Sequence, residues 1–262
     1  MSLIETLLFE WLERRTEPQA VAWLRARVAE TRQAEVAKRS RVFETAFARV
    51  PRMLGRTLFA LSEDDLATAN CLRPGWSPRD WRIDDAARAL LLLAMESVSE
   101  EVQFVAVFRR LRQSADPPEQ VALFRSLPLL KPSAGLKAEA EEGLRTNIPS
   151  VFAALAHDNP FAREVFDEAR WNQMILKALF IGCALGPIQG LDARANPRLA
   201  LMLRDFARER RTARRSTPHE LWRCLGPFAR EAAALEDLAL ALNSSDPSER
   251  EAAEAVYGGV GE

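Results

Sequence analysis

The sequence is poor in the residues on which most metal-dependent and acid–base sites depend. Its 262 residues include two histidines, one tyrosine and three cysteines, and no pair of cysteines has the CxxC spacing of a zinc or redox motif. An odd number of widely separated cysteines also indicates no disulfide framework. We therefore predict neither a metal ion nor another cofactor, and we expect the chain to reside in the reducing cytoplasm.

Charge of one sign and long apolar runs are also scarce. The 36 Lys and Arg nearly cancel the 37 Asp and Glu, so the formal net charge of -1 provides no overall field that attracts nucleic acid or an anionic membrane. The longest apolar runs, ALLLLAM and ILKALFIGCALGPI, are shorter than the roughly 20 residues that span a bilayer. Glu5 and Glu10 interrupt the region that a signal peptide would need to be apolar. We expect no membrane insertion.

Helix-forming residues with helical spacing dominate what is present. Apolar residues recur every three or four positions, and no run alternates with the period of two that indicates a strand. Several prolines stand between a capping residue and a glutamate, as in DPPE at 116–119, which is typical of a helix start. The pattern predicts helices over about 2–14, 18–48, 52–60, 63–72, 82–96, 98–113, 117–127, 134–145, 148–157, 160–166, 168–182, 197–214, 218–231, 233–243 and 247–256.

Many short helices joined by short connections favour antiparallel pairs stacked in layers, because each pair leaves an apolar face that the next pair must cover. The sequence has no strict repeat, so such an array would be irregular. We therefore predict one all-α domain over 1–262 with the architecture of an irregular, HEAT-like α-solenoid. The segment 131–149 is charged and poor in bulky apolar residues, and we interpret it as a hinge.

One apolar helix carries unexpected polar residues. The stretch DEARWNQMILKALFIG, at 167–182, contains Asn172, Gln173 and Lys177 in its middle. A buried amide or ammonium group is costly unless it finds a hydrogen-bond partner. The three residues either bond neighbouring backbone carbonyls and clasp two helices together, or they line a polar pocket. Three such residues on one short helix favour the pocket.

Other polar and aromatic residues are candidates for the same pocket. Asp192 and Arg194 lie in the loop after the helix, His157 ends an earlier helix, and the pair Trp222 and Arg223 could stack on a flat ligand. We predict no catalytic residue. The predicted ligand-binding residues are His157, Asn159, Trp171, Asn172, Gln173, Lys177, Asp192, Arg194, Trp222 and Arg223.

The densest basic run is RDFARERRTARR at 204–215. At helical spacing, Arg204, Arg208, Arg211 and Arg215 form a stripe that could bind phosphates. Acidic residues are interspersed in the run, and no aromatic residues alternate with the arginines to stack on bases. We therefore do not expect nucleic acid to be a partner.

Three stretches together resemble the EboA family over about residues 150–230. They are HDNPFAREVFDEARWNQMILKALFIG, GLDARANPRLALMLRDFARERRTARR and ELWRCLGPF. The resemblance implies a bacterial protein encoded in an ebo gene cluster, and such clusters are associated with moving precursors of secondary metabolites from the cytoplasm toward the periplasm. It also implies that a small-molecule metabolite and proteins encoded in the same cluster are partners. It brings no catalytic residue with it.

The sequence leaves three hypotheses for function. We favour a non-catalytic helical binding or adaptor protein that handles or exports a secondary-metabolite precursor, with a polar pocket in its C-terminal half. The alternative is an enzyme acting on a lipid-like or prenyl-type metabolite, in which Lys177 or Asp192 would be the acid–base group. The third is a HEAT-like nucleic-acid-binding protein that uses the arginine stripe, and it requires those arginines to line a concave surface.

Overall fold

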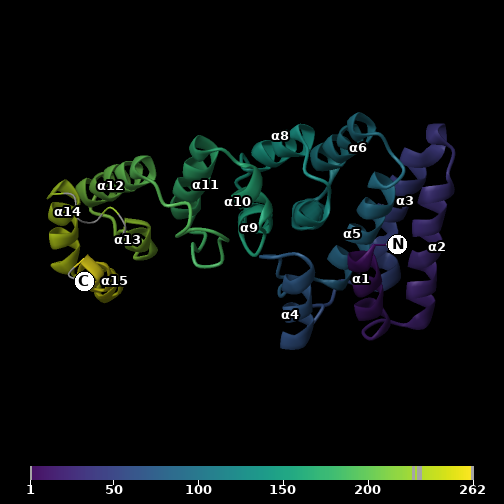
Figure 1. The fold of residues 1–262 in the computed structure, drawn as a ribbon, viewed down its shortest axis with the longest axis horizontal. Coiled ribbons are helices and arrows are strands. Elements are labelled where there is room, and N and C mark those ends of the chain that lie inside the picture. The colour runs from purple at the N-terminus through teal and green to yellow at the C-terminus, as the bar shows by residue number, and fades with distance from the viewer. Residues whose placement is uncertain (1, 226–227, 229–231, 261–262) are drawn as a thin grey trace. The chain divides into compact units, whose positions relative to one another are not determined.

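The regular secondary structure in the described residues of the computed structural model is helical (Figure 1). The structure describes residues 2–225, 228 and 232–260. Within these residues no strand is present, and one isolated antiparallel bridge joins Leu58 to Arg82. The predicted all-α fold class is therefore confirmed.

Two compact units divide the chain, Met1–Val165 and Phe166–Glu262. The prediction of a single domain with a hinge over 131–149 stays a prediction. Helix α8 (Ala134–Gly143) occupies much of that segment, and it packs against α6 (Glu101–Ser114) within the first unit.

Helix α5 (Ile83–Glu96) forms the centre of the first unit, and all its residues except Leu93 and Glu96 are buried. The other helices of this unit are α1 (Leu3–Glu13), α2 (Pro18–Gln33), α3 (Val36–Leu54), α4 (Glu63–Leu72), α7 (Pro117–Ser126), α9 (Pro149–Ala156) and α10 (Phe161–Val165), with a 3-10 turn at Leu127–Leu129. Helices α1, α2, α3 and α7 pack around α5, which explains why it is apolar on nearly every side. Helix α3 contacts α5, α5 contacts α7, and α7 contacts α9, as in a layered arrangement. The predicted α-solenoid stays a prediction.

Two predicted helix extents in this unit are wrong. The segment 18–48 forms two helices, because Ala34 and Glu35 are extended and let α3 turn back against α2. Neither glycine nor proline marks this break, so the apolar periodicity continues through it.

The predicted helix at 52–60 is also wrong, because α3 extends to Leu54 and ends at Gly55, whose φ of 85° suits a residue without a side chain. The following segment is extended. The Phe59 N–H donates to the Trp81 carbonyl at 2.8 Å and the Ile83 N–H donates to the Thr57 carbonyl at 3.0 Å. These bonds fix the loop before α5.

The second unit contains α11 (Glu168–Ile181), α12 (Pro197–Thr212), α13 (Glu220–Leu225), α14 (Ala232–Leu242) and α15 (Pro247–Val260). Helix α12 contacts α11, α13 and α14, and α15 packs against α13 and α14. The Asp167 side chain caps α11 by accepting the Arg170 N–H at 2.9 Å, and Gly182 ends it in the left-handed conformation. The helix predicted over 218–231 begins at Glu220, and most of its last part, 226–227 and 229–231, lies outside the described residues.

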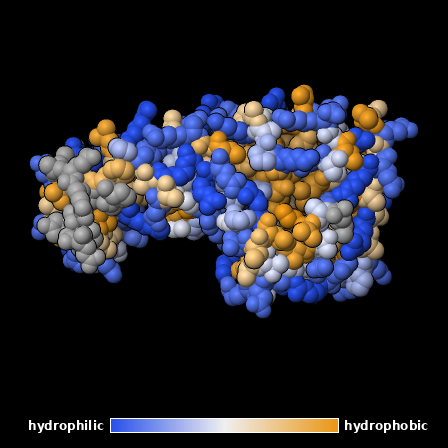
Figure 2. Space-filling view, in the orientation of Figure 1, coloured by the Kyte–Doolittle hydropathy of each residue, from blue (hydrophilic) through white to orange (hydrophobic). Residues whose placement is uncertain are grey.

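The visible surface of the first unit is mostly hydrophilic, and Figure 2 shows an apolar patch in the area between α4 and α5. No helix in the described part of the chain combines the length and the apolar character needed to cross a bilayer. The core of this unit lies around α5. The loop that precedes the amino end of α5 positions the candidate site.

Candidate functional site

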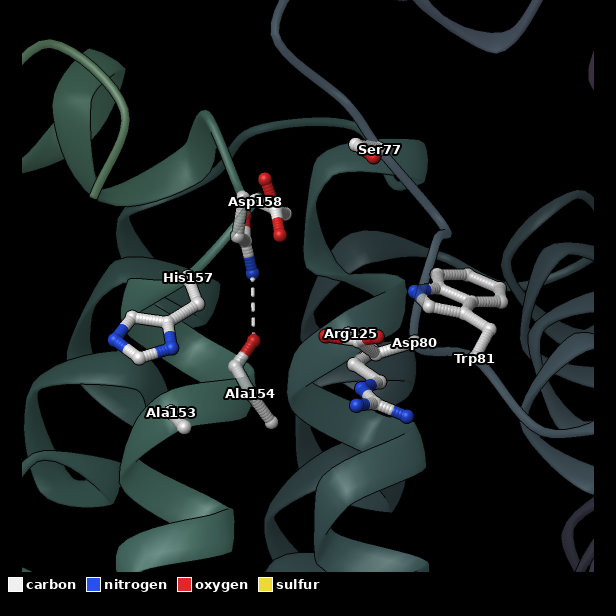
Figure 3. A pocket seen from close by; sticks show the side chains of 9 residues that line it. Ser77, Asp80, Trp81, Arg125, Ala153, Ala154, His157 and Asp158 are labelled. Carbon is white, nitrogen blue, oxygen red and sulfur yellow. Dashed lines mark hydrogen bonds between the residues drawn. The ribbon is translucent and has the colours of Figure 1, made fainter. Parts of the chain in front are cut away.

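A small polar pocket lies in the first unit where the loop after α4 meets the ends of α7 and α9 (Figure 3). Arg125 comes from the last turn of α7, and in this view it lies between Trp81 of the loop and His157, which follows α9. The Ser77 N–H donates to the Asp158 carbonyl at 3.2 Å and joins the loop to the chain after α9. The cavity measures about 90 Å³.

Asn159 builds one wall of this pocket. Its amide nitrogen donates to the Phe124 carbonyl at 3.0 Å and to the Ala154 carbonyl at 3.1 Å, the second of which is drawn in Figure 3. Its amide oxygen accepts the Phe161 N–H at 3.0 Å, and the residue is 3% exposed. Both amide hydrogens are therefore used inside the protein, and Asn159 joins the ends of α7 and α9.

Arg125 is held through only one nitrogen of its guanidinium group among the described residues. Its Nη1 donates to Asp85 Oδ2 at 2.6 Å, and the same oxygen accepts the Arg82 N–H at 2.8 Å. No other hydrogen bond of this guanidinium is found within the described residues, and the side chain is 22% exposed. Asp85 is buried in the first turn of α5. A buried carboxylate thus fixes the arginine, while its remaining N–H groups stay available beside the cavity.

A larger cavity adjoins the pocket and shares Arg125 and Asp80 with it. It measures about 460 Å³. Its polar lining includes Arg56, Arg82, Asp84, Asp85 and Ser150, and its apolar lining includes Leu58, Pro118 and Val121. The two cavities meet at Arg125, so one small molecule could contact both.

A buried ionic network lies behind the larger cavity. Arg88 is fully buried in α5, and its guanidinium donates to Asp84 at 2.8 Å and to Glu119 at 3.2 Å. Burial raises the pKa of Asp84, the neighbouring carboxylate of Asp85 raises it further, and Arg88 opposes both effects. Asp84 Oδ1 accepts no hydrogen bond from the described residues, and Arg82 Nε lies 3.8 Å from it.

The predicted site residues fall in both units. His157 and Asn159 line the small pocket of the first unit. The other eight, from Trp171 to Arg223, belong to the second unit. That the ten form one ligand site stays a prediction.

Asn172 forms a reciprocal amide pair with Asn196. The Asn172 Nδ2 donates to the Asn196 side-chain oxygen at 3.0 Å, and the Asn196 Nδ2 donates back at 2.9 Å. Asn196 also caps α12, because its side-chain oxygen accepts the Leu199 N–H at 2.8 Å. Asn172 is 1% exposed, so this pair joins α11 to the start of α12.

The other two polar residues of α11 lie in different surroundings. Gln173 is exposed, and its side-chain oxygen accepts a hydrogen bond from Arg170 at 2.9 Å. Lys177 is partly buried, and the loss of water around its ammonium group lowers its pKa. Asn172, Gln173 and Lys177 therefore do not share one environment.

Arg194 stacks on Trp171, with its guanidinium carbon 4.6 Å from the centre of the indole ring. Trp171 is fully buried and its Nε1 has no hydrogen-bond partner among the described residues. Burial lowers the pKa of Arg194, and the negative charges of Asp167 and Glu168 oppose that shift. This contact holds the loop after α11 against the helix.

Arg223 binds Asp192 through two hydrogen bonds of 3.0 and 2.6 Å, and the contact raises the pKa of Arg223. Both side chains are more than half exposed. The adjacent Trp222 is fully buried, and its Nε1 has no partner in the described part of the chain. Trp222 thus packs in the core of the unit, while Arg223 points outward to an ion pair.

Most of the arginine stripe converges on one buried carboxylate. Arg204 and Arg208 donate to the two oxygens of Asp237 at 2.8 and 3.0 Å, and Arg211 lies 3.9 Å from it. The Asp237 side chain is 2% exposed. These arginines join α12 to α14, and their positive charges are partly neutralised by Asp237.

The sequence prediction missed Arg125, Trp81, Asp80 and Arg82. One feature of the sequence indicated that charged residues meet near α5. The stretch IDDAARALLLLAME, at 83–96, places Asp84, Asp85 and Arg88 in an otherwise apolar helix. Charged residues in such a helix need partners from other segments. The sequence does not indicate which segments these are, and they turn out to be 79–82 and α7.

Comparison with known proteins adds a family. The sequence model described as metabolite traffic protein EboA matches residues 4–226. No curated protein and no solved structure matches the chain. Among the described residues, no group of three or more His, Cys, Asp or Glu side chains could hold a metal ion. The match spans most of the 262 residues and extends the resemblance well beyond residues 150–230, so the chain belongs to the EboA family.

Proposed function

We propose that the protein binds a small-molecule metabolite in the joined cavities of the first unit and holds it without converting it. Arg125 carries this proposal. Its buried partner Asp85 fixes the guanidinium at the junction of the two cavities, and the N–H groups left over have no partner among the described residues. A positioned donor with unused hydrogen bonds is what a binding site for a polar ligand needs.

Two donors of the small pocket, Arg125 and Trp81, suit binding better than proton transfer. An arginine does not give up its proton at physiological pH, and an indole nitrogen can only donate. Trp81 is 3% exposed and its Nε1 makes no hydrogen bond with the described residues, while Figure 3 shows this nitrogen on the edge of the ring nearest Arg125. Fixed donors of this kind orient a ligand and need not exchange protons with it.

The proposal gives the polar residues of the second unit a structural role. The Asn172–Asn196 pair and the Arg223–Asp192 ion pair use the groups that would otherwise contact a ligand. The pocket predicted for the C-terminal half is replaced here by the cavities around Arg125.

Native mass spectrometry of the protein purified from its own source cells tests the proposal. We expect a small bound mass in the unaltered protein that is lost in Arg125→Gln. Arg25→Gln is the control, because Arg25 is also an ion-paired helix residue and lies on α2, outside both cavities. A protein without any small mass, or an Arg125→Gln variant that keeps it, would contradict the proposal.

A further inference from the structure

Three helices begin at the larger cavity. Its lining includes Asp84 and Asp85 in the first turn of α5, Pro118 in the first turn of α7 and Ser150 in the first turn of α9. The amino end of a helix carries partial positive charge, because its first N–H groups have no partner within the helix. The cavity therefore lies where three such ends point.

The start of α9 differs from the other two. In α5 the Asp85 carboxylate accepts the Arg82 N–H, and in α7 Asp116 accepts the Glu119 N–H at 2.9 Å. In α9 the residue before the helix is Ile148, whose side chain cannot cap, and the first helical residue is a proline. The Ser150 N–H and hydroxyl have no hydrogen-bond partner among the described residues, and Ser150 is exposed. Of these three helix starts, only that of α9 has no carboxylate.

The arginines around the cavity hold unused donors. Arg82 uses its Nε to bond the Arg56 carbonyl at 2.6 Å, and its side chain is 49% exposed. Arg56 approaches Asp116 only to 4.0 Å. Three carboxylates, Asp80, Asp84 and Asp85, balance the charges of Arg82, Arg56 and Arg125 in the lining, but the arginines carry more N–H groups than these carboxylates accept. A ligand that fits the remaining N–H groups supplies acceptors, and an anionic acceptor makes the strongest bonds to a guanidinium.

Asp84 adds a second and independent requirement. Its side chain is 2% exposed and lines the cavity, yet Oδ1 accepts no hydrogen bond within the described residues. A buried acceptor without a donor is costly, so this oxygen calls for a donor from outside the chain. A ligand hydroxyl can supply that donor.

We infer that the ligand carries an oxyanion, a phosphate or a carboxylate, which lies between Arg125 and the amino end of α9, and a hydroxyl group that donates to Asp84. This inference rests on the proposed function and names the chemical class of its ligand. The oxyanion would complete the hydrogen bonds of the guanidinium and of the Ser150 N–H, which is the remaining donor of the first turn because Pro149 has no N–H and those of Val151 and Phe152 donate to the Ile148 carbonyl. The apolar side chains of Leu58 and Val121 would contact the carbon part of the molecule.

Isothermal titration calorimetry with three small probes tests the inference. Glycerol 3-phosphate and glycerate each carry hydroxyls and one kind of oxyanion, and glycerol carries hydroxyls alone. We expect measurable binding of at least one of the two anions and none of glycerol. Which anion binds more tightly distinguishes a phosphate ligand from a carboxylate ligand.

A matched pair of variants locates the anion. Ser150→Asp places a carboxylate at the second residue of α9 and should weaken binding of the anionic probe at least ten-fold. Val102→Asp places the same charge at the second residue of α6, where Val102 is 81% exposed and away from the cavity, and should change the affinity less than two-fold. Both substitutions put an acidic residue where a helix tolerates one, so folding should be retained.

The outcomes separate this inference from the proposed function. Equal binding by Ser150→Asp and Val102→Asp, or no binding of either anion, would overturn the inference. A neutral or cationic small mass that is lost in Arg125→Gln would overturn it too, while leaving the proposed function in place. Absence of any small mass from the unaltered protein would count against the proposed function itself.

Discussion

Two buried polar side chains, Arg88 and Asn159, donate to carbonyl groups that a proline four residues later cannot bond. Pro51 has no N–H for the Phe47 carbonyl one turn earlier in α3, and the Arg88 Nε–H reaches that oxygen at 3.3 Å. Pro128 likewise has none for the Phe124 carbonyl, which accepts the Leu127 N–H and, at 3.0 Å, the Asn159 side-chain amide. Each proline makes a position for a polar side chain from a distant segment. The sequence shows the prolines but not which residue will approach them.

The Asn172–Asn196 pair leads to a prediction at the same scale. Replacing Asn172 by Ala leaves the buried polar groups of Asn196 without their partner, so the free energy of unfolding should fall by about 1–3 kcal/mol. Gln173→Ala is the control on the same helix, since Gln173 is exposed and its hydrogen bond with Arg170 lies at the surface, and it should change stability by less than about 0.5 kcal/mol. Urea denaturation of both variants measures the difference. Equal, small effects would show that Asn172 does not clasp the helices.

The three cysteines should react at very different rates. Burial is the main cause that raises the pKa of Cys224 to about 12 and that of Cys183 to about 11, and nearby carboxylates add to both shifts. Both thiols therefore stay protonated at pH 8, and Cys224 is also buried, whereas Cys71 is exposed. We expect iodoacetamide to modify Cys71 first and Cys224 last in the folded protein, as followed by peptide mass spectrometry. Rapid labelling of Cys224 would mean that the second unit opens readily.

At the scale of helices, the local sequence predicted helix starts correctly where capping residues were present. Asp116 and Glu119 form the capping box that DPPE predicted, and α4 begins and ends where its prediction placed it, at 63–72. The break at Ala34 could not be predicted, because it depends on α3 packing back against α2 and not on a residue that disfavours helix. Tertiary contacts overrode a periodic pattern there.

Asp65 joins two helices and provides a test of pH dependence. It caps α4 with Ser62, and its carboxylate accepts hydrogen bonds of 2.6 Å from both Arg14 and Arg15. Burial alone would raise its pKa, but the bonds from Arg14, Ser62 and Arg15 more than offset this and lower it from 3.8 to about 2. The folded state thus binds a proton less tightly than the unfolded state, so the stabilisation is present above pH 3.8 and is lost as the pH falls toward 2.

Asp65→Asn should therefore lower the free energy of unfolding by about 1–2 kcal/mol at pH 7 and by much less near pH 2. The Asp65 and Arg15 side chains are 8% and 18% exposed, whereas Arg14 is 55% exposed, so solvent screens the bond to Arg14 more than the bond to Arg15. Glu63→Gln is the control on the same helix. Glu63 and its partner Arg79 are 77% and 55% exposed, so this substitution should change stability by less than about 0.5 kcal/mol. Chemical denaturation at both pH values measures the effect. A loss that does not depend on pH would assign it to packing and not to charge.

For the whole molecule, the sequence predicted a helical fold and a family but only a small part of the candidate site. Of the ten predicted residues, His157 and Asn159 line the small pocket, and the cavities are completed by the loop at 77–82, by Arg125 and by Ser150. These segments are far apart in the sequence, and each looks like an ordinary loop or helix end. Their convergence depends on how α5, α7 and α9 pack, which periodicity does not specify.

A crystal structure of the protein purified from its own source cells would test the central claim most directly. We predict electron density for a small molecule in the cavity of the first unit, within hydrogen-bond distance of Arg125. A ligand bound instead around Asn172 and Lys177 in the second unit, or a first-unit cavity filled by solvent alone, would contradict the account.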